Sequence, residues 1–197
     1  MTVINFVRHG KTSYTGNRIS GYLPGIPLTD EGKAQAIRTA QYLRKKPITA
    51  IYSSPLERTM ETAAIIADKF NLEIRKMDFL KEINFGILQG MGEELEQQPS
   101  WQLFLNAPSK CVFPEGESVI EARARIVTGL NRLSQIHSPT EEIICVSHCE
   151  AIRLALAHAL KKPLNSFMEI NVDTASISNV EWETDHQHVV SINTIPS

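Results

Sequence analysis

The sequence has little of what marks several classes of protein. It holds only three cysteines in 197 residues, Cys111, Cys145 and Cys149. They form no pair with metal-site spacing, and their odd number argues against a disulfide scaffold. No apolar run is long enough to span a bilayer, and the first residues lack the basic segment and apolar core of a signal peptide. We therefore expect a cytoplasmic protein that has no membrane partner.

A large excess of charge of either sign is also missing. The formal net charge is −2, with 21% charged and 42% hydrophobic residues. This balance is ordinary for a globular protein and offers no electrostatic footprint for nucleic acid. Any anion must therefore be bound by a local cluster. No repeat, low-complexity tract or linker divides the chain, so residues 1–197 are predicted to form one domain.

What the sequence does contain is an alternation of hydrophobic runs and amphipathic segments. Strands are predicted at 3–7, 50–53, 72–74, 142–147, 175–182 and 188–193, and helices at 29–44, 56–70, 93–105, 117–136 and 151–160. Pro99 and the glutamines before it interrupt the pattern of the third helix. The alternation predicts an α/β fold, a three-layer α/β/α sandwich with a mostly parallel sheet and helices on both faces.

Three predicted strands end in residues suited to binding an anion. They are followed by Arg8-His9-Gly10, by Ser53-Ser54-Pro55 with Arg58 one helical turn later, and by His148. In open α/β sheets ligands bind beyond the carboxyl ends of the strands, so adjacent strands would unite two histidines and two arginines. Arginine donates bidentate hydrogen bonds to phosphoryl oxygens, and the helix N-termini after Ser54 and His148 add N–H donors. The pattern predicts a pocket for a dianionic phosphoryl group.

Five short motifs follow one another along most of the chain. They are Arg8-His9-Gly10-x-Thr12, Ser53-Ser54-Pro55-x-x-Arg58, Glu82-x-x-Phe85-Gly86-x-x-x-Gly90, Pro114-x-Gly116-Glu117-Ser118 and Ser147-His148. Together they resemble the histidine phosphatase superfamily, also called the phosphoglycerate mutase-like family. The resemblance implies a phosphoglycerate mutase-like fold and a metal-independent enzyme that acts on a small phosphomonoester without a cofactor. It leaves open whether the protein is a monomer or a homodimer.

The resemblance also implies a role for each matched residue. His9 is the expected nucleophile, which takes the phosphoryl group as a phosphohistidine. Arg8, Arg58 and His148 are expected to hold the phosphoryl oxygens, and Glu82 to protonate the leaving oxygen. Neighbouring guanidinium groups should depress the pKa of His9 and keep it nucleophilic. Apolar surroundings should raise the pKa of Glu82 so that it can act as an acid.

The residues expected to bind substrate lie mainly in the first loop. They are Thr12, Asn17, Ser20, Gly21 and Cys149, the last replacing the Gly or Ala that commonly follows the second histidine. The asparagine that the family has after Arg-His-Gly is missing at its usual spacing, so Thr15 or Asn17 is expected to replace it. Lys11 stands where the family usually has Glu or Gln, and either adds positive charge to the entrance or points outward.

Several alternatives stand beside these assignments. Arg58 and Glu61 lie one helical turn apart and suit a surface ion pair, Glu82 suits a solvated loop, and His148 suits a structural role. A metal site of His9, His148 and Glu82 is conceivable, but the chain has no Asp-rich pattern or paired-His helix motif. Four large apolar residues of the middle segment either form a cap over the pocket or pack in the core, and the sequence favours neither alternative. They are Leu95, Trp101, Phe104 and Phe113.

The branch of the family is inferred from the segment between Met91 and Phe113. It carries one basic residue, Lys110, against three glutamates, whereas the mutases carry a longer basic insertion there. The chain is therefore expected to resemble the phosphatase branch, which includes α-ribazole phosphatase-like and broad-specificity members. Phosphoglycerate mutase-type transfer is the alternative, and a non-catalytic phospholigand-binding or interaction module is a third possibility on the same fold.

Overall fold

A computed structural model describes all residues, 1–197. One six-stranded sheet has the order β3-β2-β4-β1-β5-β6. Its strands are β1 (Thr2–Arg8), β2 (Ile48–Ser53), β3 (Ile74–Lys76), β4 (Glu142–Ser147), β5 (Ile177–Trp182) and β6 (Gln187–Thr194). The helices are α1 (Asp30–Leu43), α2 (Glu57–Ala67), α3 (Pro99–Asn106), α4 (Val119–Ile136) and α5 (Cys149–Ala159). Short 3₁₀ segments cover Asp78–Leu80, Gly86–Leu88, Glu93–Gln97, Pro108–Lys110 and Leu164–Glu169.

The sheet is mostly parallel, as predicted. Strands β3, β2, β4 and β1 run in one direction, while β5 is antiparallel to β1 and β6 is antiparallel to β5. A short connection joins β5 to β6, so these two strands form a hairpin at the edge of the sheet. The register pairs Arg8 with Ser147 and Ser53 with Val146, so β1, β4 and β2 end side by side. This edge is where the predicted anion-binding residues follow.

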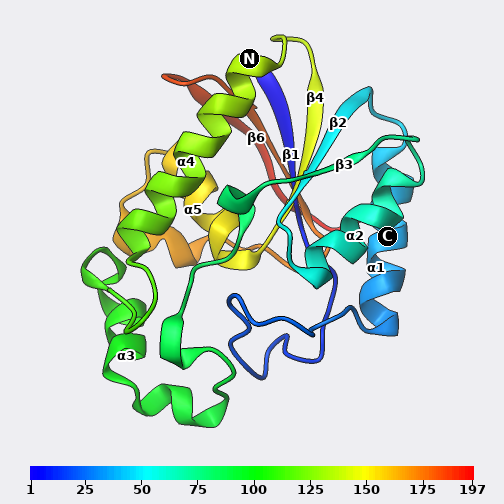
Figure 1. Cartoon of the computed structure of the whole chain (residues 1–197). Coiled ribbons are helices and arrows are strands. Elements are labelled where there is room, and N and C mark those ends of the chain that lie inside the picture. Colours follow the sequence, from blue (N-terminus) through cyan, green and yellow to red (C-terminus); the bar gives the residue numbers. More distant parts are fainter.

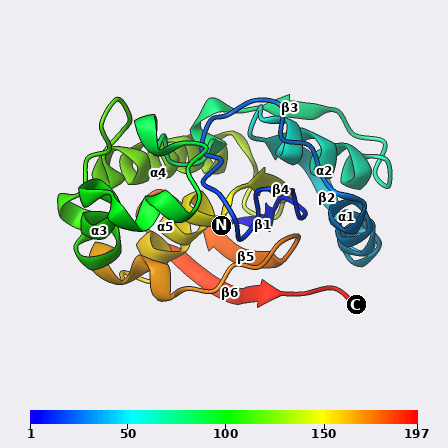
Figure 2. The ribbon, with the colours of Figure 1, turned by 90° about the horizontal axis from the view of Figure 1, so that it is seen from below.

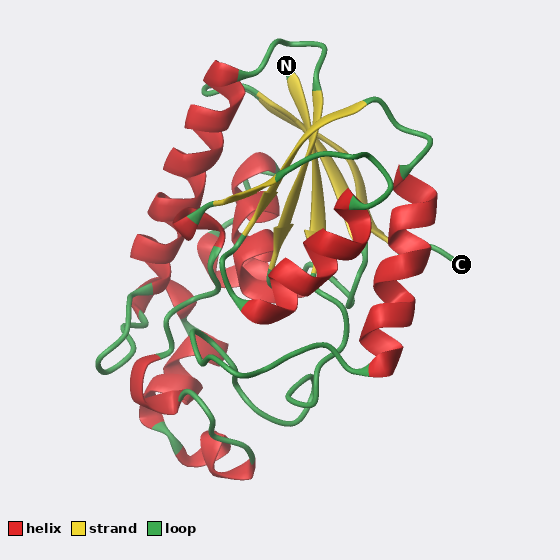
Figure 3. Ribbon diagram, turned by 45° about the vertical axis from the view of Figure 1, so that its right-hand side comes forward, coloured by secondary structure: helices red, strands yellow, loops and turns green.

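Helices cover both faces of the sheet, which confirms the three-layer prediction (Figures 1, 2 and 3). Helices α1 and α2 pack on one face around a cluster of 11 buried residues that includes Val7. Helices α4 and α5 pack on the other face, around a cluster of 32 that includes Ile4 and Phe6. Successive side chains of a strand point to opposite faces, so an apolar β1 serves both cores. No helix is both long and apolar enough to cross a membrane.

Local signals explain most element boundaries. The Thr29 hydroxyl accepts a hydrogen bond from the Gly32 N–H at the start of α1, and Ser118 and Glu121 form a capping box at the start of α4. The helix predicted at 93–105 is wrong as one element. Pro99 lacks an N–H and occupies the first turn of a new helix, so the 3₁₀ segment Glu93–Gln97 and α3 are separate.

Candidate active site

Histidine, serine and arginine side chains converge at the carboxyl ends of β1, β4 and β2. The His9 N–H donates to the Ser147 carbonyl (3.0 Å), and the Ser54 N–H donates to the Val146 carbonyl (3.0 Å). These bonds extend the sheet ladder past the strand ends and fix where each polar loop begins. Residue 10 must be glycine because a Cβ there would lie 2.3 Å from the backbone oxygen of Gly32.

His9 is a buried, neutral imidazole with one committed nitrogen. The residue is 6% exposed, and its Nδ1 contacts the Gly10 carbonyl at 2.7 Å. A carbonyl only accepts, so Nδ1 carries the proton and Nε2 keeps its lone pair. Burial lowers the pKa of His9 well below 6.5, and the charges of Arg58 and Arg8 lower it further. The predicted effect of the guanidinium groups is present, but it is secondary to burial.

His148 follows β4 and is the N-cap residue of α5, with its ring centroid 5.3 Å from that of His9. Its Nε2 lies 2.8 Å from the Ser54 hydroxyl, which also accepts the Leu56 N–H at 3.5 Å. The hydroxyl proton is therefore free to go to Nε2, which leaves the proton of His148 on Nδ1. That Nδ1 is buried and has no hydrogen-bond partner.

Two arginines are anchored to loop carbonyls beside this pair of histidines. Arg8 Nη1 donates to the Val172 carbonyl (2.7 Å), and Arg58 Nη2 donates to the Gly21 carbonyl (2.7 Å). The Nε atoms of both are buried without a partner. Burial lowers the pKa of Arg58 to about 10, so its guanidinium stays charged at neutral pH. Arg58 is only 1% exposed, and the Glu61 carboxylate accepts from the Leu28 N–H (2.8 Å), so the surface-pair alternative is wrong.

Glu82 is a buried carboxyl held by backbone N–H groups. Its Oε1 accepts from Ile83 and Ala151 (both 3.0 Å), and its Oε2 accepts from Glu150 (3.2 Å). Burial raises the pKa of Glu82 from 4.5 to about 7, and the charge of Glu150 adds to the rise. The alternative that Glu82 lies in a solvated loop is therefore wrong. The expectation that the N-terminus of α5 adds N–H donors for the anion is narrowed to Cys149, because the N–H groups of Glu150 and Ala151 are bonded to Glu82.

Arg125 in α4 fixes the loop that carries Glu82. Its guanidinium donates to the carbonyls of Phe79 (2.8 Å), Lys81 (3.1 Å) and Glu82 (3.1 Å), and pairs with Glu117 at 2.6 Å. The sequence analysis missed Arg125, since a basic residue on an amphipathic helix ordinarily faces solvent. The sequence motif included Glu117, but nothing in the sequence indicated that Arg125 pairs with it.

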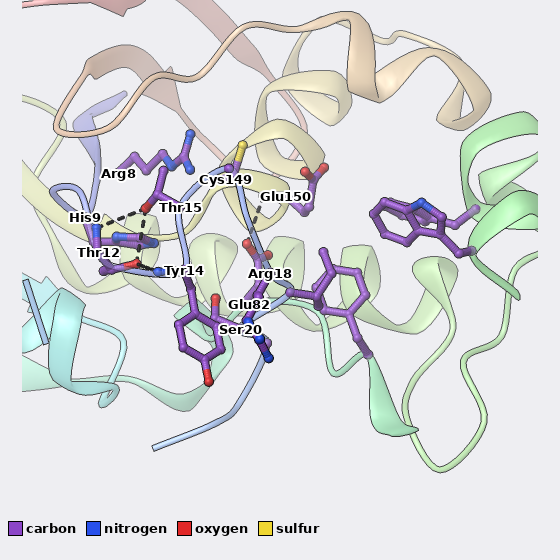
Figure 4. A pocket seen from close by; sticks show the side chains of 16 residues that line it. Arg8, His9, Thr12, Tyr14, Thr15, Arg18, Ser20, Glu82, Cys149 and Glu150 are labelled. Atoms are coloured by element: carbon purple, nitrogen blue, oxygen red, sulfur yellow. Dashed lines mark hydrogen bonds between the residues drawn. The ribbon is translucent and has the colours of Figure 1, made fainter. Parts of the chain in front are cut away.

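A cavity of about 180 Å³ opens over these groups (Figure 4). It is lined by Arg8, His9, Thr12, Tyr14, Thr15, Gly16, Arg18, Ile19, Ser20, Gly21, Glu82, Phe85, Trp101, Phe104, Cys149 and Glu150. Figure 4 shows Arg8 and His9 on one side, with Glu82 and Glu150 farther along. The cationic end denotes Arg8 and His9 with the buried Arg58 and His148. The carboxylate end denotes Glu82, Phe85, Trp101, Phe104 and Glu150.

The residues predicted to bind substrate are placed unevenly. Thr12, Ser20, Gly21 and Cys149 line the cavity, but Asn17 is exposed and its amide donates to the Ser13 carbonyl at 3.4 Å. Of the two candidates to replace the family's asparagine, only Thr15 lines the cavity. Its hydroxyl lies 3.2 Å from that of Thr12.

Other predicted neighbours divide between cavity and core. Lys11 points away and pairs with Glu31 at 2.7 Å. Trp101 and Phe104 line the cavity, and Leu95, Phe104 and Phe113 belong to the buried core. Phe104 therefore fits both interpretations of this segment, whereas Trp101 fits the cap, and Leu95 and Phe113 fit the core. Five further lining residues were not predicted from the sequence because no motif marks them: Tyr14, Gly16, Arg18, Ile19 and Glu150.

The arrangement suits anion chemistry better than metal chemistry. No group of three or more His, Cys, Asp or Glu side chains surrounds a common point where a cation would sit. The cationic end instead presents three buried nitrogens without partners, on Arg8, Arg58 and His148. Leaving a buried donor unsatisfied costs about 1–3 kcal/mol, so such groups are kept where a ligand accepts from them. An oxyanion is the ligand that this donor set fits.

Comparisons with known proteins bear on the same site. A sequence model of the histidine phosphatase superfamily (branch 1) matches residues 4–195. Phosphoserine phosphatase 1 of Hydrogenobacter thermophilus is 32% identical over 98% of this chain and 92% of its own. A probable phosphoglycerate mutase, GpmB of Yersinia enterocolitica, is 30% identical over 93% of this chain and 86% of its own. Phosphoserine phosphatase from Entamoeba histolytica, in complex with 3-phosphoglyceric acid, has a TM-score of 0.87 at 28% identity, covering 98% of both chains.

Proposed function

This chain belongs to the histidine phosphatase superfamily (branch 1), whose phosphatases act without metals, and we propose that it hydrolyses small phosphomonoesters through a phosphohistidine on His9. The observation that carries the proposal is the set of three unpartnered buried nitrogens, on Arg8, Arg58 and His148, beside a neutral imidazole. These donors match the oxygens of a phosphoryl group, and the imidazole supplies the nucleophile.

In the first step, His9 Nε2 attacks phosphorus. The N–P bond forms while the bond from phosphorus to the ester oxygen breaks, and negative charge spreads over three equatorial oxygens. Arg8, Arg58 and His148 donate hydrogen bonds to those oxygens, which lowers the barrier because the donors are already fixed. Glu82 gives its proton to the leaving oxygen, which departs as an alcohol.

In the second step, water replaces His9 on phosphorus. The Glu82 carboxylate formed in the first step takes a proton from the attacking water, and the N–P bond breaks as inorganic phosphate forms. Glu82 therefore serves as acid and then base, which requires a pKa near the working pH. The pKa of about 7 that burial gives Glu82 suits both tasks.

The carboxylate end favours a small alcohol with an apolar part. The cavity, about 180 Å³, is below the range of roughly 300–1,000 Å³ typical of larger ligands. Phe85, Trp101 and Phe104 give its wall an aromatic lining next to Glu82. Phosphoserine phosphatases among the relatives make phosphoserine the first natural ester to test.

Mutase transfer is the second candidate, because GpmB is 30% identical. A mutase must hold a second anionic group of its substrate and exclude water from the phosphoenzyme. Here Lys110, the single basic residue of the segment 91–113, does not line the cavity. Arg18 does line it, and its Nη1 donates to the Gly90 carbonyl at 3.0 Å. A single arginine beyond Arg8 and Arg58 is a poor clamp for a second anionic group, and this scarcity of cations favours hydrolysis.

The test compares wild type with His9→Ala on p-nitrophenyl phosphate and phosphoserine, each with and without EDTA. We expect phosphate release that is unaffected by EDTA and lost in the variant. His188→Ala is the matched control, since His188 is exposed and pairs with Glu181 on β5, outside the cavity. Faster phosphoryl transfer to a sugar acid than to water would favour the mutase. Binding of phosphate without any turnover would favour a binding module and overturn the proposal.

A further inference from the structure

One charged pair beside Glu82 has no role in the scheme above. Glu150, in the first turn of α5, lines the cavity, and its side chain is 15% exposed. Its Oε1 accepts from Arg153 Nη1 at 2.8 Å, while its Oε2 is buried without a partner. Arg153 is anchored in turn by a bond from Nε to the Ile170 carbonyl (2.7 Å). The carboxylate of Glu150 is therefore fixed in place.

Glu150 also contacts Glu82 through its backbone. The same residue that donates its N–H to Glu82 Oε2 (3.2 Å) holds its own carboxylate in the cavity wall. The backbone N–H of Glu150 belongs to the first turn of α5, which is rigid. The carboxyl groups of Glu82 and Glu150 therefore keep a fixed position relative to each other. A second negative charge in a poorly solvated wall opposes ionisation of the first.

Several other charges face Glu82, and they act in opposite directions. Arg58 from α2 and the N–H groups of Ile83 and Glu150 favour its ionised form. Arg153 on α5 partly offsets Glu150, and Arg125 on α4 binds the backbone carbonyl of the acid. Arg8 lies at the other end of the cavity, and His9 and His148 are neutral there. Glu150 is thus the one carboxylate that opposes these cations.

We propose that Glu150 is a positioning residue that adds to the effect of burial and favours the protonated form of Glu82, by holding an Arg153-anchored negative charge beside it. The inference rests on the proposed function, in which Glu82 protonates the leaving group. The charge assists both chemical steps. It keeps the proton on Glu82 until the leaving oxygen accepts it, and it makes the carboxylate a stronger base toward water afterwards.

The experiment is a direct titration of Glu82 by ¹³C NMR, in protein labelled at the glutamate side-chain carboxyl carbon. Glu82→Gln identifies the signal. In Glu150→Gln, which keeps the shape and the backbone N–H, we expect the midpoint of Glu82 to fall by about one pH unit. Glu150→Ala removes the same charge with a different shape and should move the midpoint in the same direction. Glu169→Gln is the matched control, because Glu169 is exposed and pairs with Lys162.

A kinetic measurement gives the second readout. The loss of kcat/KM at high pH reports deprotonation of Glu82, so in Glu150→Gln it should shift to lower pH by the same amount. An unchanged midpoint in both Glu150 variants overturns the inference, even if wild type hydrolyses phosphomonoesters as proposed. If wild type turns over no phosphate ester, the proposed function fails separately, and the NMR midpoint still decides whether Glu150 controls the protonation of Glu82.

Discussion

The two ends of the cavity are built in different ways. At the cationic end, Arg8, His9 and His148 follow directly from β1 and β4, and Arg58 projects from α2 next to β2. At the carboxylate end, Glu82 and Phe85 come from irregular chain between β3 and α4, Trp101 and Phe104 come from the short helix α3, and Glu150 comes from the first turn of α5. We therefore expect the residues at the strand ends to act on the phosphoryl group, and those of the carboxylate end to act on the leaving group. The predictions below test that division.

The largest expected effect separates substrates by their leaving groups. Glu82→Gln should lower kcat/KM for phosphoserine by about 10²–10⁴-fold, since an alkoxide cannot leave without a proton. The loss on p-nitrophenyl phosphate should be far smaller, because p-nitrophenolate leaves unprotonated. Initial rates on both esters measure the split. Glu93→Gln, an exposed change in the same segment, is the control. An equal loss on both substrates would contradict the assignment of Glu82 as the acid.

At the cationic end, no such dependence on the leaving group is expected. Arg58→Gln should lower kcat/KM by about 10²–10³-fold on every ester, because it removes a fixed donor to the phosphoryl oxygens. It should also raise the pKa of His9, whose value Arg58 depresses, so the loss of activity at low pH should begin at a higher pH. Rate–pH profiles measure the shift. Arg38→Gln, an exposed change on α1, should alter neither quantity. A loss of kcat/KM for esters of only one leaving group would contradict the proposed separation of roles between the two ends.

A smaller effect is expected from the aromatic wall. Trp101→Ala should raise KM for esters with an apolar leaving group by roughly 5–30-fold, which corresponds to about 1–2 kcal/mol of lost apolar contact. Competitive inhibition by inorganic phosphate is the internal control, because phosphate occupies the cationic end alone. If the inhibition constant for phosphate changes as much as KM, Trp101 acts through the fold rather than through the leaving group.

The last prediction concerns the stability of the irregular segment, where the smallest effect on catalysis is expected. Gly86 has φ +55°, and a Cβ there would lie 1.9 Å from the Pro114 backbone oxygen. Gly86→Ala should lower the free energy of unfolding by about 2–4 kcal/mol, measured by urea denaturation. Gly25→Ala is the matched control, because Gly25 has φ +72° but no atom near its Cβ. It should cost about 1 kcal/mol, the backbone strain alone. Equal losses of unfolding free energy in the two variants would show that the contact between residue 86 and the Pro114 backbone oxygen has no effect on stability.

The same division explains what could be predicted from the sequence. Arg8, His9 and His148 were predictable because each follows an apolar strand, and parallel neighbours end at one edge. Glu150 was not, because an acid three residues before Arg153 is the ordinary pattern of a solvated helix face. Only the packing of α5 against the Glu82 loop buries it.

Residues in irregular chain were equally hard to place. In the first loop Thr15 lines the cavity and Asn17 is exposed to solvent. Turns decide these orientations, and a turn has no sequence periodicity from which they could be predicted. The antiparallel hairpin of β5 and β6 follows from a short connection, whereas the position of β5 beside β1 depends on contacts across the sheet. The roles assigned to the catalytic set, and the single-domain organisation, stay predictions.

The central claim is that His9 takes the phosphoryl group from the ester and passes it to water. The most direct measurement is to mix the enzyme with a ³²P-labelled ester, quench it in base within milliseconds, and map the labelled peptide by mass spectrometry. The account predicts a base-stable, acid-labile phosphate on His9, formed and lost at rates compatible with turnover, and absent in His9→Ala. Turnover without any phosphoenzyme, or with the label on another residue, would contradict it.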